Sequence, residues 1–270
     1  MNSRYKFLFS TNFLCFYIEK YFPDSNSTES SVPLKDSECE FLLGILTVPG
    51  NNKLRNTSRN TWIKDLPKKV CYKFLYDKTK YISSEEKFDG ISLNSKHEGK
   101  GIRFGEKLYK FFTYVQNNEK YQNVRYVVKM DDDVVLCPER LFPFLENHNL
   151  NSRTYAGWFH HIDMDLGFHH RADEMFIILG RVLMSRIVSK RYCQHRNQKT
   201  CDSLGHIFDT NYGGTSLGLW LSKMNDVNEL HLNGYVEELR NSEISLNTKD
   251  ALLYHPTKTV EKMQEKYLKC

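Results

Sequence analysis

Apolar residues in the first half of the chain form short, nearly continuous runs that end at turn-forming or polar residues. Runs of this kind indicate strands that are buried on both faces of a parallel sheet. They cover residues 41–50, 70–77, 87–93 and 125–136. Helices are predicted for residues 105–118, where apolar side chains recur at helical spacing, and from Pro138 to Glu146. The alternation of strands with helices predicts an α/β domain with a mostly parallel central sheet.

The second half of the chain has a less regular pattern. Residues 174–190 contain a strand-like run, a Gly-Arg break and a helical segment. Residues 213–224 carry apolar side chains at i, i+3, i+4 and i+7, which predicts a helix with one buried face. An apolar segment at 251–255 precedes a polar surface helix at 257–269. The sequence contains neither a G-x-G-x-x-G nor a G-x-x-x-x-G-K-[ST] phosphate loop.

The first 38 residues differ in composition from the rest. Arg4 and Lys6 precede an apolar run at 7–18, so we expect residues 1–20 to form a cytosolic tail and a short signal anchor. The run is shorter than an ordinary membrane span, and an amphipathic start is the alternative. Residues 21–38 are polar with two prolines and predict a stem. Residues 39–270 then form a single folded domain.

Two features favour the secretory route. Asn26 and Asn56 each begin an N-x-[ST] sequon, the acceptor pattern for N-glycosylation. Six of the seven cysteines lie outside the apolar run and can form disulfides in an oxidising lumen. Cys193 and Cys201 are the easiest local pair, and the cysteine and histidine spacings do not indicate zinc. We therefore expect a glycosylated, lumenal domain.

Charge does not identify a partner. The formal net charge is +5, but the 38 basic and 33 acidic residues are scattered along the whole length. A nucleic-acid-binding protein would show a clustered basic stripe instead, so we expect no nucleic-acid partner.

Three adjacent carboxylates, Asp131, Asp132 and Asp133, follow an apolar run. A buried carboxylate is costly unless it is paired, hydrogen-bonded or bound to a cation, so the triplet requires partners. At the end of a parallel strand it would lie where such sheets bind ligands. Asp131 and Asp133 would point to the same side of an extended chain, and their carboxylate oxygens suit Mg²⁺ or Mn²⁺. A nucleotide-sugar transferase, a metal-dependent phosphatase or nuclease, and a simple surface turn all fit, whereas the offsets of an EF-hand are missing.

Several motifs together narrow these alternatives. The stretch "RNTSRNTW" (Arg55 to Trp62) resembles the R-x-x-x-R-x-T-W motif of the inverting β-1,3-galactosyltransferase family, glycosyltransferase family 31. "VVKMDDDVV" resembles the K-x-DDD strand of that family, and "GRVLMS" is a degraded form of its G-x-G-Y-x-x-S element. "TSLGLWL" and "LLYHPTKTVEKMQEKY" are most similar to the branch that adds galactose to the proteoglycan linkage region. The resemblance covers roughly residues 40–268.

The resemblance implies a GT-A type fold and an enzyme that moves a hexose, galactose above all, from a UDP-sugar to a glycan acceptor in β-1,3 linkage. It also implies Mn²⁺, or Mg²⁺ in its place, and a single-pass type II protein of the Golgi membrane. By position, Asp133 and His255 would bind the metal. The residues that would bind the donor are Arg55, Arg59, Asp131 and Asp132.

Some of these assignments have plain structural alternatives. Arg55 and Arg59 would also suit salt bridges within the fold, and His255 would suit the surface at a helix start. Trp62 is expected in the core.

The sequence departs from the family at the expected general base. The acidic pair of E-D-V-x-x-G aligns with Gly213 and Gly214, which cannot take a proton. Asp209 is the nearest substitute, and Asp202 and Glu174 are poorer ones. The chain is therefore predicted to be an active transferase with a different base, or a weak or inactive relative that binds UDP and metal. The segment 174–180 also lacks the family's Tyr-Pro acceptor residues.

Overall fold

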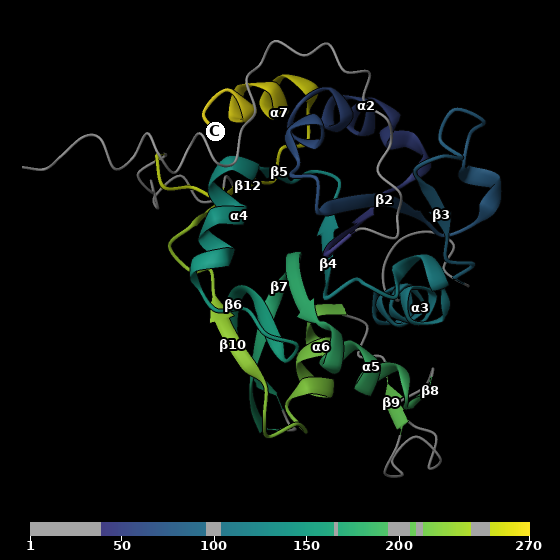
Figure 1. The fold of residues 1–270 in the computed structure, drawn as a ribbon, viewed down its shortest axis with the longest axis vertical. Coiled ribbons are helices and arrows are strands. Elements are labelled where there is room, and N and C mark those ends of the chain that lie inside the picture. Colours follow the sequence, from purple (N-terminus) through teal and green to yellow (C-terminus); the bar gives the residue numbers. More distant parts are fainter. Residues whose placement is uncertain (1–38, 96–103, 165–166, 194–205, 209–212, 239–248) are drawn as a thin grey trace, which may run out of the picture. The chain divides into compact units, whose positions relative to one another are not determined.

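Seven strands form the central sheet of the computed structural model, in the order β10-β6-β7-β4-β1-β2-β3 (Figure 1). The structure describes residues 39–95, 104–164, 167–193, 206–208, 213–238 and 249–270. The strands of the sheet are β1 (Phe41–Leu46), β2 (Val70–Tyr76), β3 (Gly90–Ser92), β4 (Tyr126–Asp131), β6 (Thr154–Met164), β7 (Gly167–Gly180) and β10 (Asn228–His231). Only β7 of these seven runs antiparallel to its neighbours. The predicted α/β class with a mostly parallel sheet is confirmed.

Helices and two small sheets complete the described part of the fold. The helices are α2 (Asn52–Asn60), α3 (Phe104–Asn117), α4 (Pro138–Asn147), α5 (Arg181–Val188), α6 (Gly213–Leu221) and α7 (Val260–Tyr267). A three-stranded sheet contains β11 (Val236–Glu238), β12 (Leu253–His255) and β5 (Val135–Leu136). A two-stranded sheet pairs β8 (Arg191–Cys193) with β9 (His206–Phe208). These elements belong to one compact unit.

The central strands separate two hydrophobic cores because successive side chains point to opposite faces of a strand. In β4, Val128 and Met130 join the core that packs against α2, α4 and α7. Val127 joins the other core, which packs against α3, α5 and α6 (Figure 1). A sheet covered by helices on both faces explains why its strands are apolar along their whole length. Trp62 is fully buried, as predicted.

The sequence prediction missed β6 and the outer half of β7, whereas the inner half of β7 lies in the strand-like run predicted within 174–190. The segment 154–164 mixes histidines and an aspartate with apolar residues, so neither a continuous apolar run nor a strict alternation marks it. A register shift after Gly157 breaks the hairpin and removes the period-two signal there. Elsewhere the predicted elements are present, although β3 is shorter than 87–93 and α6 ends at Leu221 rather than at 224.

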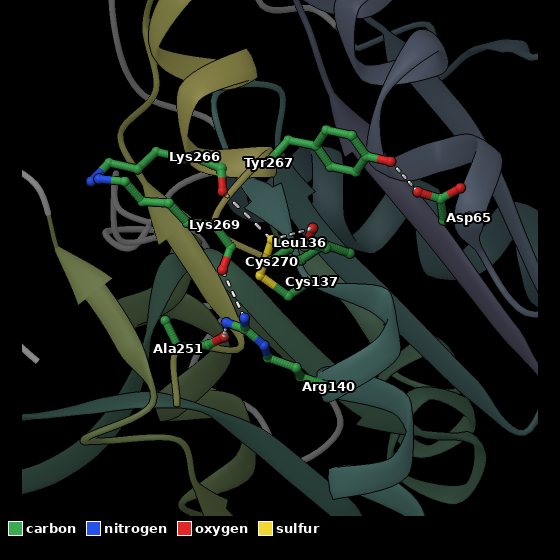
Figure 2. The surroundings of a disulfide bond; sticks show 9 residues. All are labelled: Asp65, Leu136, Cys137, Arg140, Ala251, Lys266, Tyr267, Lys269 and Cys270. Carbon is green, nitrogen blue, oxygen red and sulfur yellow. Dashed lines mark hydrogen bonds between the residues drawn. A yellow bond between two sulfur atoms is a disulfide. The ribbon is translucent and has the colours of Figure 1, made fainter. Parts of the chain in front are cut away.

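Two disulfides fasten the described unit. Cys39 is bonded to Cys71 next to β1 and β2. Cys137, which precedes α4, is bonded to Cys270 beyond α7 (Figure 2). Arg140 strengthens this second link because its guanidinium donates to the carbonyls of Ala251 and Lys269. The segment that leads into β12 and the end of α7 are thereby tied to α4.

Several predictions fall outside the described residues. The proposed anchor and stem, Asn26 and the Cys193–Cys201 pair depend on residues that the structure does not describe. Among the residues that it does describe, no helix is long and apolar enough to cross a membrane.

The Cys137–Cys270 bond should contribute strongly to stability because it closes a loop with a sequence separation of 133 residues. Replacing both cysteines by serine should lower the free energy of unfolding by about 2–5 kcal/mol, measured by guanidinium denaturation. A reducing agent should then have a smaller effect on the variant than on the wild type. Equal unfolding midpoints for the two proteins would contradict this.

Candidate metal centre

The three carboxylates lie at the carboxyl end of β4, beside the carboxyl end of β1. Asp131 is the last residue of β4 and pairs with Leu46, the last residue of β1. The backbone N–H of Asp132 donates to the carbonyl of Leu46 at 3.1 Å. Because neighbouring parallel strands end at one edge of a sheet, the loops that follow them surround the triplet.

Asp131 is paired with a buried ammonium group from its own strand. Nζ of Lys129 lies 2.7 Å from Oδ1 of Asp131, and it also donates to the backbone carbonyl of Glu174. The Lys129 side chain is 2% exposed, whereas that of Asp131 is 30% exposed. The charge of the lysine therefore compensates one side of this carboxylate and leaves the other side facing outward.

Asp132 points away from solvent and is bonded to the loop after β1. It accepts hydrogen bonds from Oγ1 of Thr47 at 2.5 Å and from the amide of Asn51 at 3.0 Å. Burial raises the pKa of Asp132 to about 6, although both hydrogen bonds act to lower it. In this arrangement Asp132 fastens β4 to the β1–α2 loop.

Asp133 faces His255, the last residue of β12. Nε2 of His255 lies 3.5 Å from Oδ1 of Asp133, and the backbone carbonyl of Asp133 accepts hydrogen bonds from the N–H and hydroxyl of Thr257. Burial alone would raise the pKa of Asp133, but the hydrogen bond and charge of His255 hold it below its usual value. His255 is buried, so the alternative of a surface histidine is wrong.

The side chains of Asp131, Asp133 and His255 form a donor set that fits a divalent cation. One ligand atom from each residue lies within 4.8 Å of the others. Two carboxylate oxygens and one imidazole nitrogen suit Mn²⁺, and the oxygens also suit Mg²⁺. Asp131 and Asp133 are half-buried, so the set is reachable from outside. The structure thus brings His255 to two aspartates that lie more than a hundred positions earlier in the sequence.

Arg55 and Arg59 both form ion pairs within the fold. Nε of Arg55 lies 2.5 Å from Glu86, and Nη1 donates to Oγ1 of Thr47, the residue that holds Asp132. Arg59 binds Asp89 through two nitrogens. Both arginines therefore have the salt bridges that were the structural alternative.

The two arginines also line a cavity of about 620 Å³ beside the β1–α2 loop. Its other lining residues are Pro49, Asn52, Asn56, Tyr81, Ser83, Glu85 and Glu86. Arg55 is almost completely buried, whereas the side chain of Arg59 is 23% exposed. Arg59 is thus the arginine that a ligand in this cavity would meet first.

The remaining predicted residues are placed as follows. Gly213 and Gly214 begin α6, and Glu174 lies in β7 with its carbonyl bonded to Lys129. Asn56 is exposed on α2 and accepts a hydrogen bond from Arg59. Asp202 and Asp209 lie outside the described residues.

Three residues of the site escaped the sequence prediction. Thr47 and Asn51 stand next to a Pro-Gly turn and carry no motif signal of their own. Lys129 could have been found, because it lies two residues before Asp131 and so points to the same side of the strand.

Comparison with known proteins adds structural likenesses only. No protein-family profile and no curated protein matches this sequence. A glycosyltransferase involved in the glycosylation of the major capsid of PBCV-1 is 9% identical, with a TM-score of 0.48 over 85% of this chain and 99% of that one. Mouse xyloside xylosyltransferase 1 is 10% identical, with a TM-score of 0.42 over 80% of this chain and 97% of that one.

A third solved structure is the glycosyltransferase GlyE of Streptococcus pneumoniae TIGR4. It is 11% identical, with a TM-score of 0.45 over 85% of this chain and 60% of that one. All three TM-scores are below 0.5.

Because of the Arg55–Glu86 pair, we expect the stability of the fold to decrease in acid. Burial alone would raise the pKa of Glu86, but Arg55, together with hydrogen bonds from Tyr76 and Ser83, lowers it overall from 4.5 to about 2. A depressed carboxyl pKa stabilises the fold above pH 4.5, and this stabilisation is lost as the pH falls toward 2. The loss should total up to about 3 kcal/mol.

Urea denaturation between pH 5 and pH 2 tests this expectation. The free energy of unfolding should fall less steeply with pH in Glu86→Gln than in the wild type. The exposed Glu119→Gln serves as a control and should keep the wild-type slope. An unchanged slope in Glu86→Gln would show that this pair is not the acid-sensitive one.

Proposed function

We propose that this protein is a metal-dependent glycosyltransferase that moves a hexose from a UDP-sugar to a glycan acceptor. The observation that carries the proposal is the convergence of Asp131, Asp133 and His255 at the carboxyl ends of the parallel strands. A mostly parallel sheet with a metal-binding group at this edge is what a GT-A type enzyme requires. The motif resemblance described above, which includes these three residues, supports the same assignment.

The β1–α2 loop connects the carboxylate triplet with a cavity in which we place the donor. The cavity lined by Arg59 adjoins the β1–α2 loop, and that loop is bonded to Asp132. A guanidinium group that is partly exposed suits a diphosphate. We infer that the nucleotide lies along this loop, with its diphosphate toward Asp131 and Asp133.

Each residue at the site then has a definite task. Asp131, Asp133 and His255 would hold Mn²⁺, which neutralises the charge that develops on a diphosphate leaving group. Lys129 fixes the orientation of Asp131, and Thr47 and Asn51 fix Asp132. Because these contacts are already made in the folded chain, the ligands need little reorganisation when the donor binds.

The finer assignments rest on the motif resemblance. They are galactose as the sugar, a β-1,3 linkage, a glycan acceptor on a glycoprotein, proteoglycan or glycolipid, and residence in the Golgi lumen behind a type II anchor. N-glycosylation at Asn26 and Asn56 belongs with this location.

A second candidate is a relative that binds UDP and metal without transferring sugar. Gly213 and Gly214 favour it, because they occupy the start of α6 where the family carries its acidic pair. Loss of a general base typically costs about 10² to 10⁴ in rate.

The transferase proposal predicts Mn²⁺-dependent turnover of one donor. UDP-galactose, UDP-N-acetylgalactosamine and UDP-N-acetylglucosamine should be compared with and without Mn²⁺, with release of UDP as the measured signal. Asp133→Ala should abolish turnover because the metal loses a ligand. Asp226→Ala is the matched control, since Asp226 is an exposed aspartate in a surface ion pair with Arg186. Full activity in Asp133→Ala would refute the metal assignment.

The binding-only candidate makes a different prediction for the same protein. Mn²⁺ and UDP together should raise the melting temperature of the wild type but not of Asp133→Ala, with no turnover of any donor. Thermal unfolding followed by fluorescence measures this binding, and turnover of any donor by the wild type would exclude the binding-only candidate.

A further inference from the structure

The β6–β7 hairpin extends beyond the edge of the sheet at which the metal ligands lie. Met130 of β4 pairs with Phe176 of β7, and β4 ends one residue later. Because β7 is antiparallel to β4, the residues of β7 before Phe176 continue past that end. This part of the hairpin, which we call the arm, therefore lies beside the candidate metal centre.

A bulge marks the point where this arm begins. Gly157 pairs with Ile177, but the next recorded pair is Phe159 with Ala172, so Trp158 faces residues 173–176. Bulges of this kind redirect side chains and are frequent next to active sites. Here Lys129 connects the bulge to the site, because its Nζ donates hydrogen bonds to both Asp131 and the backbone carbonyl of Glu174.

The bulge holds an aspartate–histidine pair. Oδ2 of Asp173 lies 3.1 Å from Nε2 of His160, and Oδ1 of Asp173 accepts from the N–H of Met175 at 3.0 Å. Both side chains are accessible, with 35% of His160 and 24% of Asp173 exposed. The ring of Trp158 lies 4.9 Å from that of His160 and limits its movement. A carboxylate on Nε2–H fixes the tautomer in which Nδ1 accepts a proton.

We propose that His160 is the general base of the transfer reaction and that Asp173 is its positioning residue. This inference rests on the proposed glycosyltransferase function and supplies the base that Gly213 and Gly214 do not. The acceptor hydroxyl gives its proton to Nδ1 of His160 while its oxygen forms a bond to C1 of the donor sugar. The bond from C1 to the phosphate oxygen breaks, and its electron pair leaves with UDP. Trp158 forms an apolar wall beside the base.

The test compares full-length variants in two assays. Transfer from UDP-galactose to benzyl β-galactoside in the presence of Mn²⁺ measures the reaction. Calorimetric binding of UDP with Mn²⁺ and thermal unfolding measure whether the donor site and the fold are intact. His160→Gln should lower transfer by about 10²-fold or more while UDP binding changes less than threefold. Asp173→Asn should lower transfer by a smaller factor, and added imidazole should partly restore His160→Ala.

His148→Gln is the control. His148 is an exposed histidine at the end of α4, outside the hairpin, and its Nδ1 lies 2.7 Å from the carbonyl oxygen of Phe144. It should keep transfer within about twofold of the wild type. Asp209→Ala tests the competing base and should also keep most of the activity.

The outcomes are distinguishable. Wild-type transfer with unchanged rates in His160→Gln overturns the base assignment alone. The same conclusion follows if Asp209→Ala, and not His160→Gln, loses transfer while binding UDP. A wild type that neither binds Mn²⁺ with UDP nor transfers sugar overturns the proposed function, and the base assignment with it.

Discussion

The structure around the carboxyl end of β4 depends on one electrostatic constraint: three successive carboxylates must each find a different partner. A carboxylate that loses water without gaining a partner is strongly destabilising, and three neighbours also repel one another. Asp131 is paired with Lys129. Asp132 accepts hydrogen bonds from Thr47 and Asn51, and Asp133 lies beside His255. Each partner comes from a different element, so satisfying the triplet joins β4, the β1–α2 loop and β12.

Other interactions of the unit support these three contacts. Arg55 is buried with Glu86 and donates to Thr47, and it therefore links the loop that holds Asp132 to the segment before β3. Removing one partner of a buried ion pair leaves an uncompensated charge, so Arg55 and Glu86 hold each other in place. The Cys137–Cys270 bond (Figure 2) and the hydrogen bond from Arg140 to Ala251 restrain the segment that leads into β12 and thus His255.

Much of the fold was predictable because its strands are buried on both faces and so appear as continuous apolar runs. The main omission has a related cause, since residues 154–164 mix histidines and an aspartate with apolar residues and so contain no continuous apolar run. At the site, motif positions identified Asp131, Asp133 and His255, whereas the hydrogen bonds of Thr47 and the ion pairs of Arg55 depend on packing between distant segments. The aspartate–histidine pair in the hairpin was unpredictable for this reason too, because a bulge sets its geometry.

The central claim is that Asp131, Asp133 and His255 bind one divalent cation together with a nucleotide diphosphate. The most direct measurement is a crystal structure of the protein grown with Mn²⁺ and UDP, with anomalous diffraction recorded at the manganese edge. The account predicts one anomalous peak within coordination distance of Asp133 and His255 and in contact with the diphosphate. An anomalous map without a peak there, although UDP is bound, would contradict it.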